Sequence, residues 1–179
     1  MLAALVIVPL FLSQAAQPWE EPPGRAPECL AVKVASSAAQ DDAQGRREPA
    51  FSTTRILELQ LSTMLRRNLA GTHLLELKLY TPRGNLYQVL SVPFGDVSGG
   101  PPGPKPRRRY LAGYPAPLDE KRPEPAEVEG RQRLMLSSSL PVAGTSIVTS
   151  SLYGSWTVVP YLDGRPEPCG TASRFTIGQ

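Results

Sequence analysis

The sequence has few of the residues on which most protein chemistry depends. Its 179 residues include one histidine and two cysteines. A histidine–cysteine zinc site needs about four such ligands, so these counts exclude it, and they argue against most histidine-dependent catalysis. Phosphate and calcium motifs are also missing: there is no P-loop, no Gly-x-Gly-x-x-Gly run and no Asp-x-Asp-x-Asp-Gly loop. The sequence therefore indicates no cofactor and no metal.

Long apolar runs are also missing. The longest, residues 1–12, rises only about 18 Å as a helix, against a hydrocarbon core of roughly 30 Å. Ser13 and Ala15 then supply the small-x-small pattern of a signal-peptidase site. No Lys or Arg precedes the run, which a start codon further upstream would explain. We predict a signal peptide over residues 1–15 and no stable membrane insertion after its cleavage. A buried N-terminal strand or helix is the alternative.

Charge of one sign is not concentrated anywhere. The net charge is +3, and the arginine clusters at 46–47, 66–67 and 107–109 are separated by acidic residues. A nucleic-acid-binding protein presents a coherent basic stripe. We therefore expect no nucleic-acid partner.

Proline and glycine are abundant, which argues against a helical bundle. The chain has 20 prolines and 15 glycines, where an average composition of roughly 5% proline would give about nine prolines. Four prolines fall in residues 16–28, which we interpret as a tether, and eight fall between residues 101 and 125. We predict that residues 97–130 form a long, mobile insertion, partly in the polyproline II conformation and without regular elements.

The remaining segments alternate apolar and polar residues, as strands do. Residues 30–34 show this pattern, and residues 75–80 and 86–94 are predicted to form a hairpin around a Pro-x-Gly turn. Residues 55–69 are ambiguous: Leu57, Leu59 and Leu61 alternate as in a strand, but a helical face also fits.

The C-terminal part continues the alternation. Residues 154–161 and 173–177 are predicted strands, and Asp163-Gly164 is a strong hairpin-turn signal between them. About seven short strands separated by turn residues are typical of a sandwich. We expect an all-β domain over residues 29–179, an Ig-like antiparallel β-sandwich carrying the Pro-rich insertion.

The two cysteines, Cys29 and Cys169, lie at opposite ends of this domain. Such a pair in an exported domain predicts one disulfide, with the two Cα atoms within about 7 Å. Two unpaired thiols in a cytosolic protein are the alternative.

Two segments resemble a known family. The run from Leu140 to Ile177 has a Gly-x-Trp-x-Val strand, an Asp-Gly turn and a Phe-x-Ile strand, and residues 77–87 have a Pro-x-Gly hairpin. Both are similar to hairpins of bacterial exported Ig-like or macroglobulin-type β-sandwich domains. The resemblance implies this fold and a secreted or surface location. The Pro-rich insertion departs from the pattern, and no thioester-type Cys-Gly-Glu-Gln sequence is present.

Few residues point to a site. Trp156 is expected in the core. The cluster of Arg107, Arg108, Arg109, Tyr110 and Tyr114 is a candidate partner epitope, with a solvated loop as the alternative.

The catalytic signals are weaker. A Ser-His-Asp triad would need a nucleophilic serine for His73, but the sequence has no Gly-x-Ser-x-Gly nucleophile elbow. The carboxylates of Glu58, Glu76 and Asp163 are expected on solvated faces or a turn. We assign no catalytic residue.

The sequence predicts an exported, non-enzymatic binding or structural module, secreted, periplasmic or at the cell surface, with a protein or glycan partner. Two alternatives remain open. One is a hydrolase whose carboxylates are not placed, and the other is a subunit of a surface assembly that pairs through a strand edge.

Overall fold

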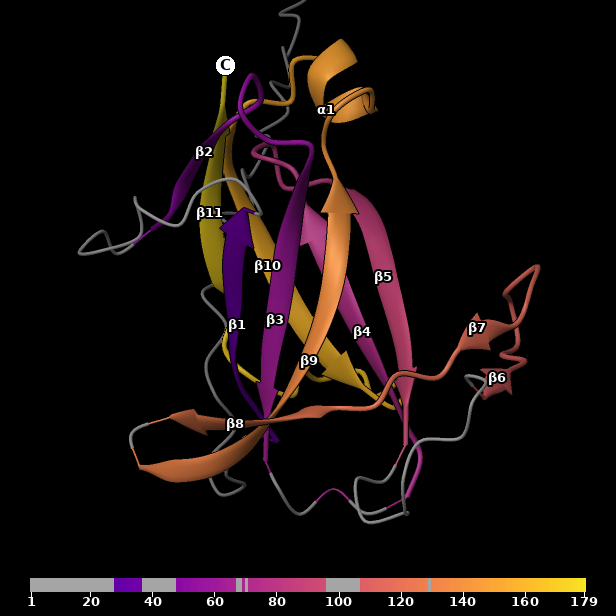
Figure 1. The fold of residues 1–179 in the computed structure, drawn as a ribbon. Coiled ribbons are helices and arrows are strands. Elements are labelled where there is room, and N and C mark those ends of the chain that lie inside the picture. The colour runs from indigo at the N-terminus through magenta and orange to yellow at the C-terminus, as the bar shows by residue number, and fades with distance from the viewer. Residues whose placement is uncertain (1–27, 37–47, 67–68, 70, 96–106, 129) are drawn as a thin grey trace, which may run out of the picture.

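Two β-sheets pack face to face around the alternating apolar side chains (Figure 1). The computed structural model describes residues 28–36, 48–66, 69, 71–95, 107–128 and 130–179. The predicted signal peptide and the tether up to residue 27 lie outside these residues.

The first sheet has four strands in the order β1-β3-β9-β8, all antiparallel. Its strands are β1 (Cys29–Ser36), β3 (Glu58–Leu65), β9 (Arg131–Pro141) and β8 (Glu124–Val128).

The second sheet has the order β2-β11-β10-β4-β5, antiparallel except for the parallel β2–β11 pair. Its strands are β2 (Ala50–Ser52), β11 (Ser173–Gly178), β10 (Gly154–Leu162), β4 (His73–Tyr80) and β5 (Leu86–Phe94).

A short pair, β6 (Arg108–Arg109) with β7 (Leu118–Asp119), and one helical turn, α1 (Ser146–Thr149), complete the described elements. The predicted all-β antiparallel sandwich is confirmed, and its Ig-like subclass stays a prediction.

The ambiguous segment 55–69 contains a strand. In β3, Leu59, Leu61, Thr63 and Leu65 are fully buried, whereas Glu58 and Gln60 are exposed and Ser62 and Met64 are half-buried. Leu57 differs from the expectation: it precedes β3 and is 76% exposed, whereas Ile56 is buried. The reason is that the chain turns just before β3, and the Leu57 carbonyl accepts the N–H groups of two residues after β9, so the two-residue period begins only at Glu58.

The core role of Trp156 on β10 is confirmed. Its side chain is fully buried, and its indole N–H donates to the Leu152 carbonyl at 2.9 Å. The ring meets Tyr87 edge-on at 5.1 Å and stacks on Phe175 at 6.3 Å. A buried tryptophan whose N–H is satisfied stabilises the core, so Trp156 is not available for a ligand.

The β4–β5 hairpin is confirmed, but the connection from β10 to β11 is longer than a tight hairpin. Asp163 and Gly164 do form a turn with positive φ angles of 56° and 66°, yet β11 begins only at Ser173. The intervening residues carry Cys169, which is held beside β1, so the chain cannot fold back directly.

The predicted disulfide is confirmed. Cys29 and Cys169 are bonded, with their Cα atoms 5.1 Å apart, and the Cys29 N–H donates to the Cys169 carbonyl at 2.9 Å. A Cβ at Gly170 would lie 2.1 Å from the Cys29 carbonyl oxygen, so only glycine fits there. The bond joins β1 to the loop after β10, unlike the inter-sheet strand-to-strand disulfide of antibody domains.

The expectation that residues 97–130 lack regular elements is wrong for residues 107–128. This part forms β6, β7 and β8, and β8 pairs with the first five residues of β9. The physical reason is that the polyproline II and β regions are close in φ and ψ. A Pro-rich chain can therefore lie extended along a sheet edge, where a missing N–H removes no ladder bond. Residues 96–106 and 129 lie outside the described residues, and the mobility of the insertion stays a prediction.

Candidate functional site

The predicted epitope lies on the β6–β7 hairpin, which projects from the β5 side of the sandwich (Figure 1). Two of its arginines are engaged within the hairpin region. Arg108 Nε lies 3.2 Å from a carboxylate oxygen of Asp119, and Arg109 Nε lies 3.3 Å from one of Glu120. The Glu120 N–H donates to the Arg107 carbonyl at 2.7 Å. The arginines therefore stabilise the hairpin through ion pairs and also contribute positive charge to its surface.

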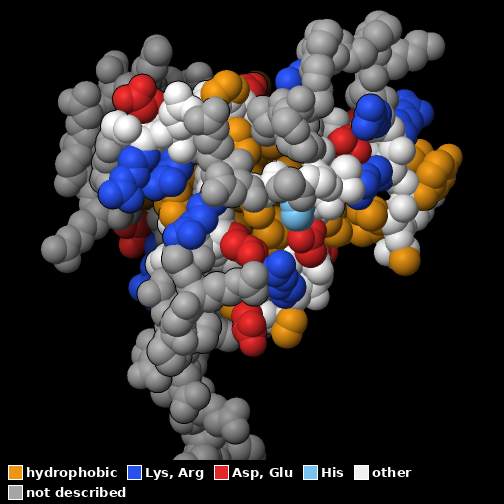
Figure 2. All heavy atoms as spheres, turned by 90° about the horizontal axis from the view of Figure 1, so that it is seen from below, with side chains coloured by type: hydrophobic (Ala, Val, Ile, Leu, Met, Phe, Trp, Pro, Cys, Tyr) orange, Lys and Arg blue, Asp and Glu red, His pale blue; other side chains and the backbone are white. Residues whose placement is uncertain are grey.

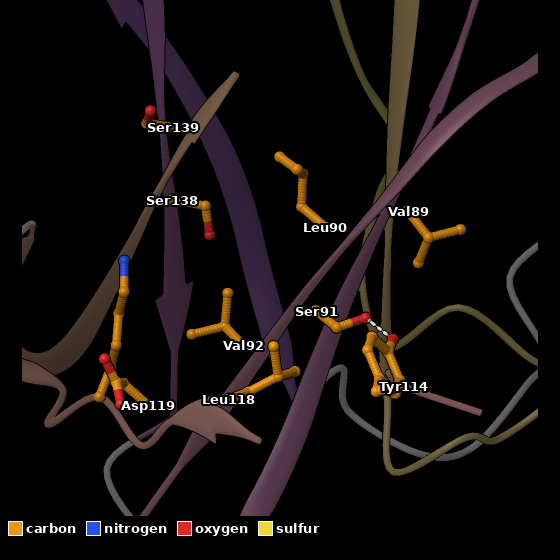
Figure 3. Close-up of a pocket in the computed structure, with 10 residues that line it drawn as sticks. Val89, Leu90, Ser91, Val92, Tyr114, Leu118, Asp119, Ser138 and Ser139 are labelled. Carbon is orange, nitrogen blue, oxygen red and sulfur yellow. Dashed lines mark hydrogen bonds between the residues drawn. The ribbon is translucent and has the colours of Figure 1, made fainter. Parts of the chain in front are cut away.

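The two tyrosines of the predicted cluster are separated. Tyr110 is 85% exposed at the surface of the hairpin. Tyr114 turns back towards the sandwich, where its hydroxyl forms a hydrogen bond with the Ser91 hydroxyl of β5 (Figure 3). The structure thus keeps Arg107, Arg108, Arg109 and Tyr110 together and assigns Tyr114 to the anchor of the hairpin.

Lys121 makes a second anchor at this side. Its backbone N–H donates to the Pro93 carbonyl of β5 at 2.8 Å, and its Nζ donates to the Ser137 carbonyl of β9 at 2.7 Å. This residue therefore links the outer strand of one sheet to the other sheet, and holds the hairpin in place.

A cavity lies next to this link, between β5 and β9 (Figure 3). Its volume is about 380 Å³, at the small end of the roughly 300–1,000 Å³ of ligand cavities. Leu90 and Val92 of β5 and Leu118 of β7 supply apolar walls, and Ser138 of β9 faces them. Polar and charged side chains complete the lining, namely Ser91, Tyr114, Asp119, Lys121 and Ser139, so the cavity combines apolar walls with polar groups.

The Ser138 hydroxyl is a polar group without a partner. The residue is 6% exposed, and its Oγ makes no hydrogen bond. Thr63 and Ser36 also carry buried hydroxyls without partners, but only Ser138 is among the residues that line the cavity. An unsatisfied buried hydroxyl costs about 1–3 kcal/mol, so a ligand that bonded it would recover that energy.

Three residues of this region were not predicted from the sequence: Lys121, Ser91 and Ser138. Only Ser138 could have been recognised from the sequence. It is a polar residue at an inward-facing position of β9, two residues from Leu136 on one side and from Leu140 on the other. Nothing local marks Lys121 or Ser91, whose contacts are made with distant strands.

The structure brings His73 and Asp163 together, although the sequence treats them separately. His73 Nδ1 lies 2.8 Å from Asp163 Oδ2, and the Leu74 N–H donates to the other carboxylate oxygen at 2.9 Å. Figure 2 shows the histidine at the lower surface with acidic side chains beside it. Since one carboxylate oxygen is held by the backbone, the pair joins the turn after β10 to the start of β4.

The other candidate carboxylates are dispersed. Glu58 lies on β3 and accepts a hydrogen bond from the Ser139 hydroxyl at 2.7 Å, whereas Glu76 lies on β4 in the opposite sheet. Within the described ranges, no three His, Cys, Asp or Glu side chains gather as a metal site would require.

Two titratable groups have shifted pKa values. Burial raises the pKa of Tyr161 from its ordinary value, and the neighbouring Tyr80 raises it further. Lys78 Nζ lies 4.0 Å from the centre of the Tyr161 ring. The hydrogen bond from Arg165 to Glu28, 2.7 Å long, raises the pKa of Arg165. Neither group lies at the cavity, so these shifts concern stability.

Comparisons with known proteins leave the family open. No protein-family model matches the chain, and no curated protein matches it. Among the described residues, no helix is long and apolar enough to span a bilayer.

Proposed function

We propose that this chain is an exported, non-enzymatic binding module that holds a partner protein through the β6–β7 hairpin. The disulfide between Cys29 and Cys169 supports export, because such bonds persist in oxidising compartments. The apolar run of residues 1–12, followed by a small-x-small site, supports the same conclusion.

One observation carries the proposal: the hairpin is anchored, yet it displays a large aromatic side chain. Tyr114 and Lys121 tie its base to β5 and β9, while Tyr110 stays 85% exposed. Tyrosine and arginine are enriched at the residues that dominate binding energy in protein interfaces. A pre-anchored hairpin loses less conformational entropy on binding, which raises affinity.

A protein partner fits this surface better than a glycan. Sugar rings stack on exposed aromatic faces, but Trp156 is buried. Among the described residues, the large hydrophobic side chains that are exposed are Leu57, Leu86, Tyr110 and Val128, of which one is aromatic. A lone tyrosine beside arginines is typical of a protein-binding anchor.

The test is capture of the partner from the cell envelope by the immobilised, disulfide-intact protein. We expect Tyr110→Ala to weaken binding at least about tenfold, the size of a single hot-spot residue. Leu86→Ala is the matched control, because Leu86 is also exposed (53%) but lies at the start of β5. Equal binding by wild type and Tyr110→Ala would contradict the proposal.

A deletion sharpens the test. Removing residues 99–128 would also remove β8 and uncover β9. Replacing residues 108–119 with a short Gly-Ser link avoids this, because the Arg107 carbonyl already meets the Glu120 N–H. This variant should fold and lose the partner.

Export and the lack of catalysis have their own tests. N-terminal sequencing should show cleavage after Ala15, and a retained Met1 in a soluble cytosolic fraction would overturn export. Turnover of a sugar or peptide that a single Asp or Glu substitution abolishes would overturn the non-enzymatic assignment.

A further inference from the structure

The strand β9 has a neighbour along only part of its outer edge. It runs from Arg131 to Pro141, and β3 pairs with it from Leu134 to the end. On the other side β8 pairs only with residues 131–135. Before Glu124 the chain crosses to β5, where Lys121 bonds to Pro93. Among the described residues, no strand pairs with the outer edge of β9 beyond β8, so this edge is unpaired along residues 136–141 (Figure 1).

The backbone groups of this half-edge can be assigned from one hydrogen bond. The Ser137 carbonyl accepts from Lys121 Nζ, so it faces away from β3. In an antiparallel strand, the residues whose backbone groups bond to one neighbour alternate with those that face the other side. The N–H and carbonyl of Ser139 therefore face the vacant side too, where no described group bonds them.

The cavity lies where a side chain of an added strand would point. Residues directly opposite on neighbouring strands project to the same face of a sheet. Ser138 projects inward, to the cavity between the sheets (Figure 3). A residue opposite Ser138 on an added strand would therefore enter the cavity, beside Leu90, Val92 and the unpartnered Ser138 hydroxyl.

We infer that residues 138–141 of β9, together with this cavity, form a docking site for a short extended segment of the partner protein. The segment adds a strand to the first sheet and places in the cavity a side chain with an apolar body and a hydroxyl, such as threonine. Cross-strand Thr–Ser pairs form hydrogen bonds of this kind. The inference rests on the proposed function, since it supplies a second contact for the same partner.

Two features select this occupant. Pro141, at the end of β9, lacks the N–H that continued pairing needs, so the site accepts a short segment and resists edge-to-edge aggregation. A second copy of the chain does not fit: symmetric pairing about Ser139 would place Leu140 opposite Ser138, and Leu140 is fully buried in its own core. The cavity would then stay unfilled.

The experiment uses the full, disulfide-intact protein and an acetylated nonapeptide of alternating threonine and lysine. Amide hydrogen exchange measured by NMR should show fast exchange of the Ser139 N–H in the free protein. At saturating peptide we expect this exchange to slow at least about tenfold, because the N–H then donates to the added strand. A peptide N-methylated at every residue, which offers no N–H on either edge, should give no protection.

A side-chain control tests the cavity. Replacing the threonines with valines should weaken binding to the wild-type protein, because valine leaves the Ser138 hydroxyl unbonded. With Ser138→Ala, the preference for threonine over valine should disappear while the Ser139 protection remains. An unchanged preference would overturn the role of the Ser138 hydroxyl.

Three results would overturn the docking site. The first is slow exchange of the Ser139 N–H in the free protein, and the second is no protection by the peptide at millimolar concentration. The third is protection that rises with the concentration of the protein itself, which would indicate dimerisation.

Tyr110→Ala separates this inference from the proposed function. The variant should keep the peptide-induced protection while losing affinity for the partner. Loss of peptide binding in Tyr110→Ala would show that the peptide binds the hairpin. That result would refute the docking site on β9 and leave the proposed function standing.

Discussion

The imidazole of His73 lies 2.8 Å from the carboxylate of Asp163, ninety residues further along the chain. Asp163 also exchanges backbone contacts with Leu74: its N–H donates to the Leu74 carbonyl, and its carboxylate accepts the Leu74 N–H. Asp163 has a positive φ of 56°, a conformation that Asp and Asn tolerate better than most residues. The pair therefore fastens the turn after β10 to β4.

Substitutions at Asp163 should separate these contributions. Asp163→Asn keeps an acceptor for the Leu74 N–H and tolerates the left-handed backbone, so we expect the free energy of unfolding to fall by less than about 1 kcal/mol. Asp163→Ala loses the acceptor and strains the backbone, and should cost about 2 kcal/mol. Urea unfolding measures both. Equal losses would show that the charge, and not the backbone contacts, matters.

Leu57 and Leu59 should respond oppositely to truncation, although the alternation of the sequence treats them alike. Leu59 is fully buried and Leu57 is 76% exposed. We expect Leu59→Ala to lower the free energy of unfolding by about 2–5 kcal/mol, and Leu57→Ala to change it by less than about 0.5 kcal/mol. Denaturant titration of the two variants checks this, and a large loss in Leu57→Ala would place Leu57 in the core.

Removal of the disulfide should destabilise the domain strongly. The bond joins residues separated by 140 positions, and the chain-entropy model gives about 5 kcal/mol for a loop of this length, an upper figure. Cys29→Ala, Cys169→Ala and the double variant should all lose the same amount, since each removes the same bond. Unequal losses, or two free thiols found by non-reducing mass spectrometry of the exported protein, would contradict this account.

The insertion should be cut by trypsin before the sandwich. β6 and β7 have two residues each, so opening this pair breaks few hydrogen bonds. We expect the first cleavage within Arg107–Arg109, with Arg131 and Arg133 of β9 resistant. Mass spectrometry of the early fragments identifies the site. First cleavage at Arg66 would show that the ordered and mobile segments had been exchanged.

Stability should fall at alkaline pH partly because of Tyr161. Burial and Tyr80 raise its pKa in the folded state above the ordinary value of 10.0. As the pH rises past 10.0, the unfolded chain loses the Tyr161 proton first, so the unfolded state is favoured. Tyr161→Phe should therefore show a smaller loss of unfolding free energy between pH 9 and about 11 than the wild type. Tyr87→Phe is the control, and an identical decline in both variants would contradict the assignment.

Much of the fold was predictable because its signals are local. Alternation of apolar residues marks the strands of the hairpin 75–94 and of the C-terminal pair, since successive side chains of a strand face opposite sides. Two cysteines allow one disulfide, so counting was enough to pair Cys29 with Cys169. The aromatic core position of Trp156 followed from its place in a strand.

The candidate site was only partly predictable. Local sequence was enough to predict the main strands of the sandwich and the disulfide, but it did not reveal β6, β7 and β8. Contacts between distant segments set the limited coverage of β9 by β8, the link that Lys121 makes between the two sheets, and the position of Ser138 at a cavity. They also set the exposure of Leu57 and the pairing of His73 with Asp163. The physical reason is that alternation is written in neighbouring residues, whereas strand register and edge coverage depend on contacts between segments far apart in the chain.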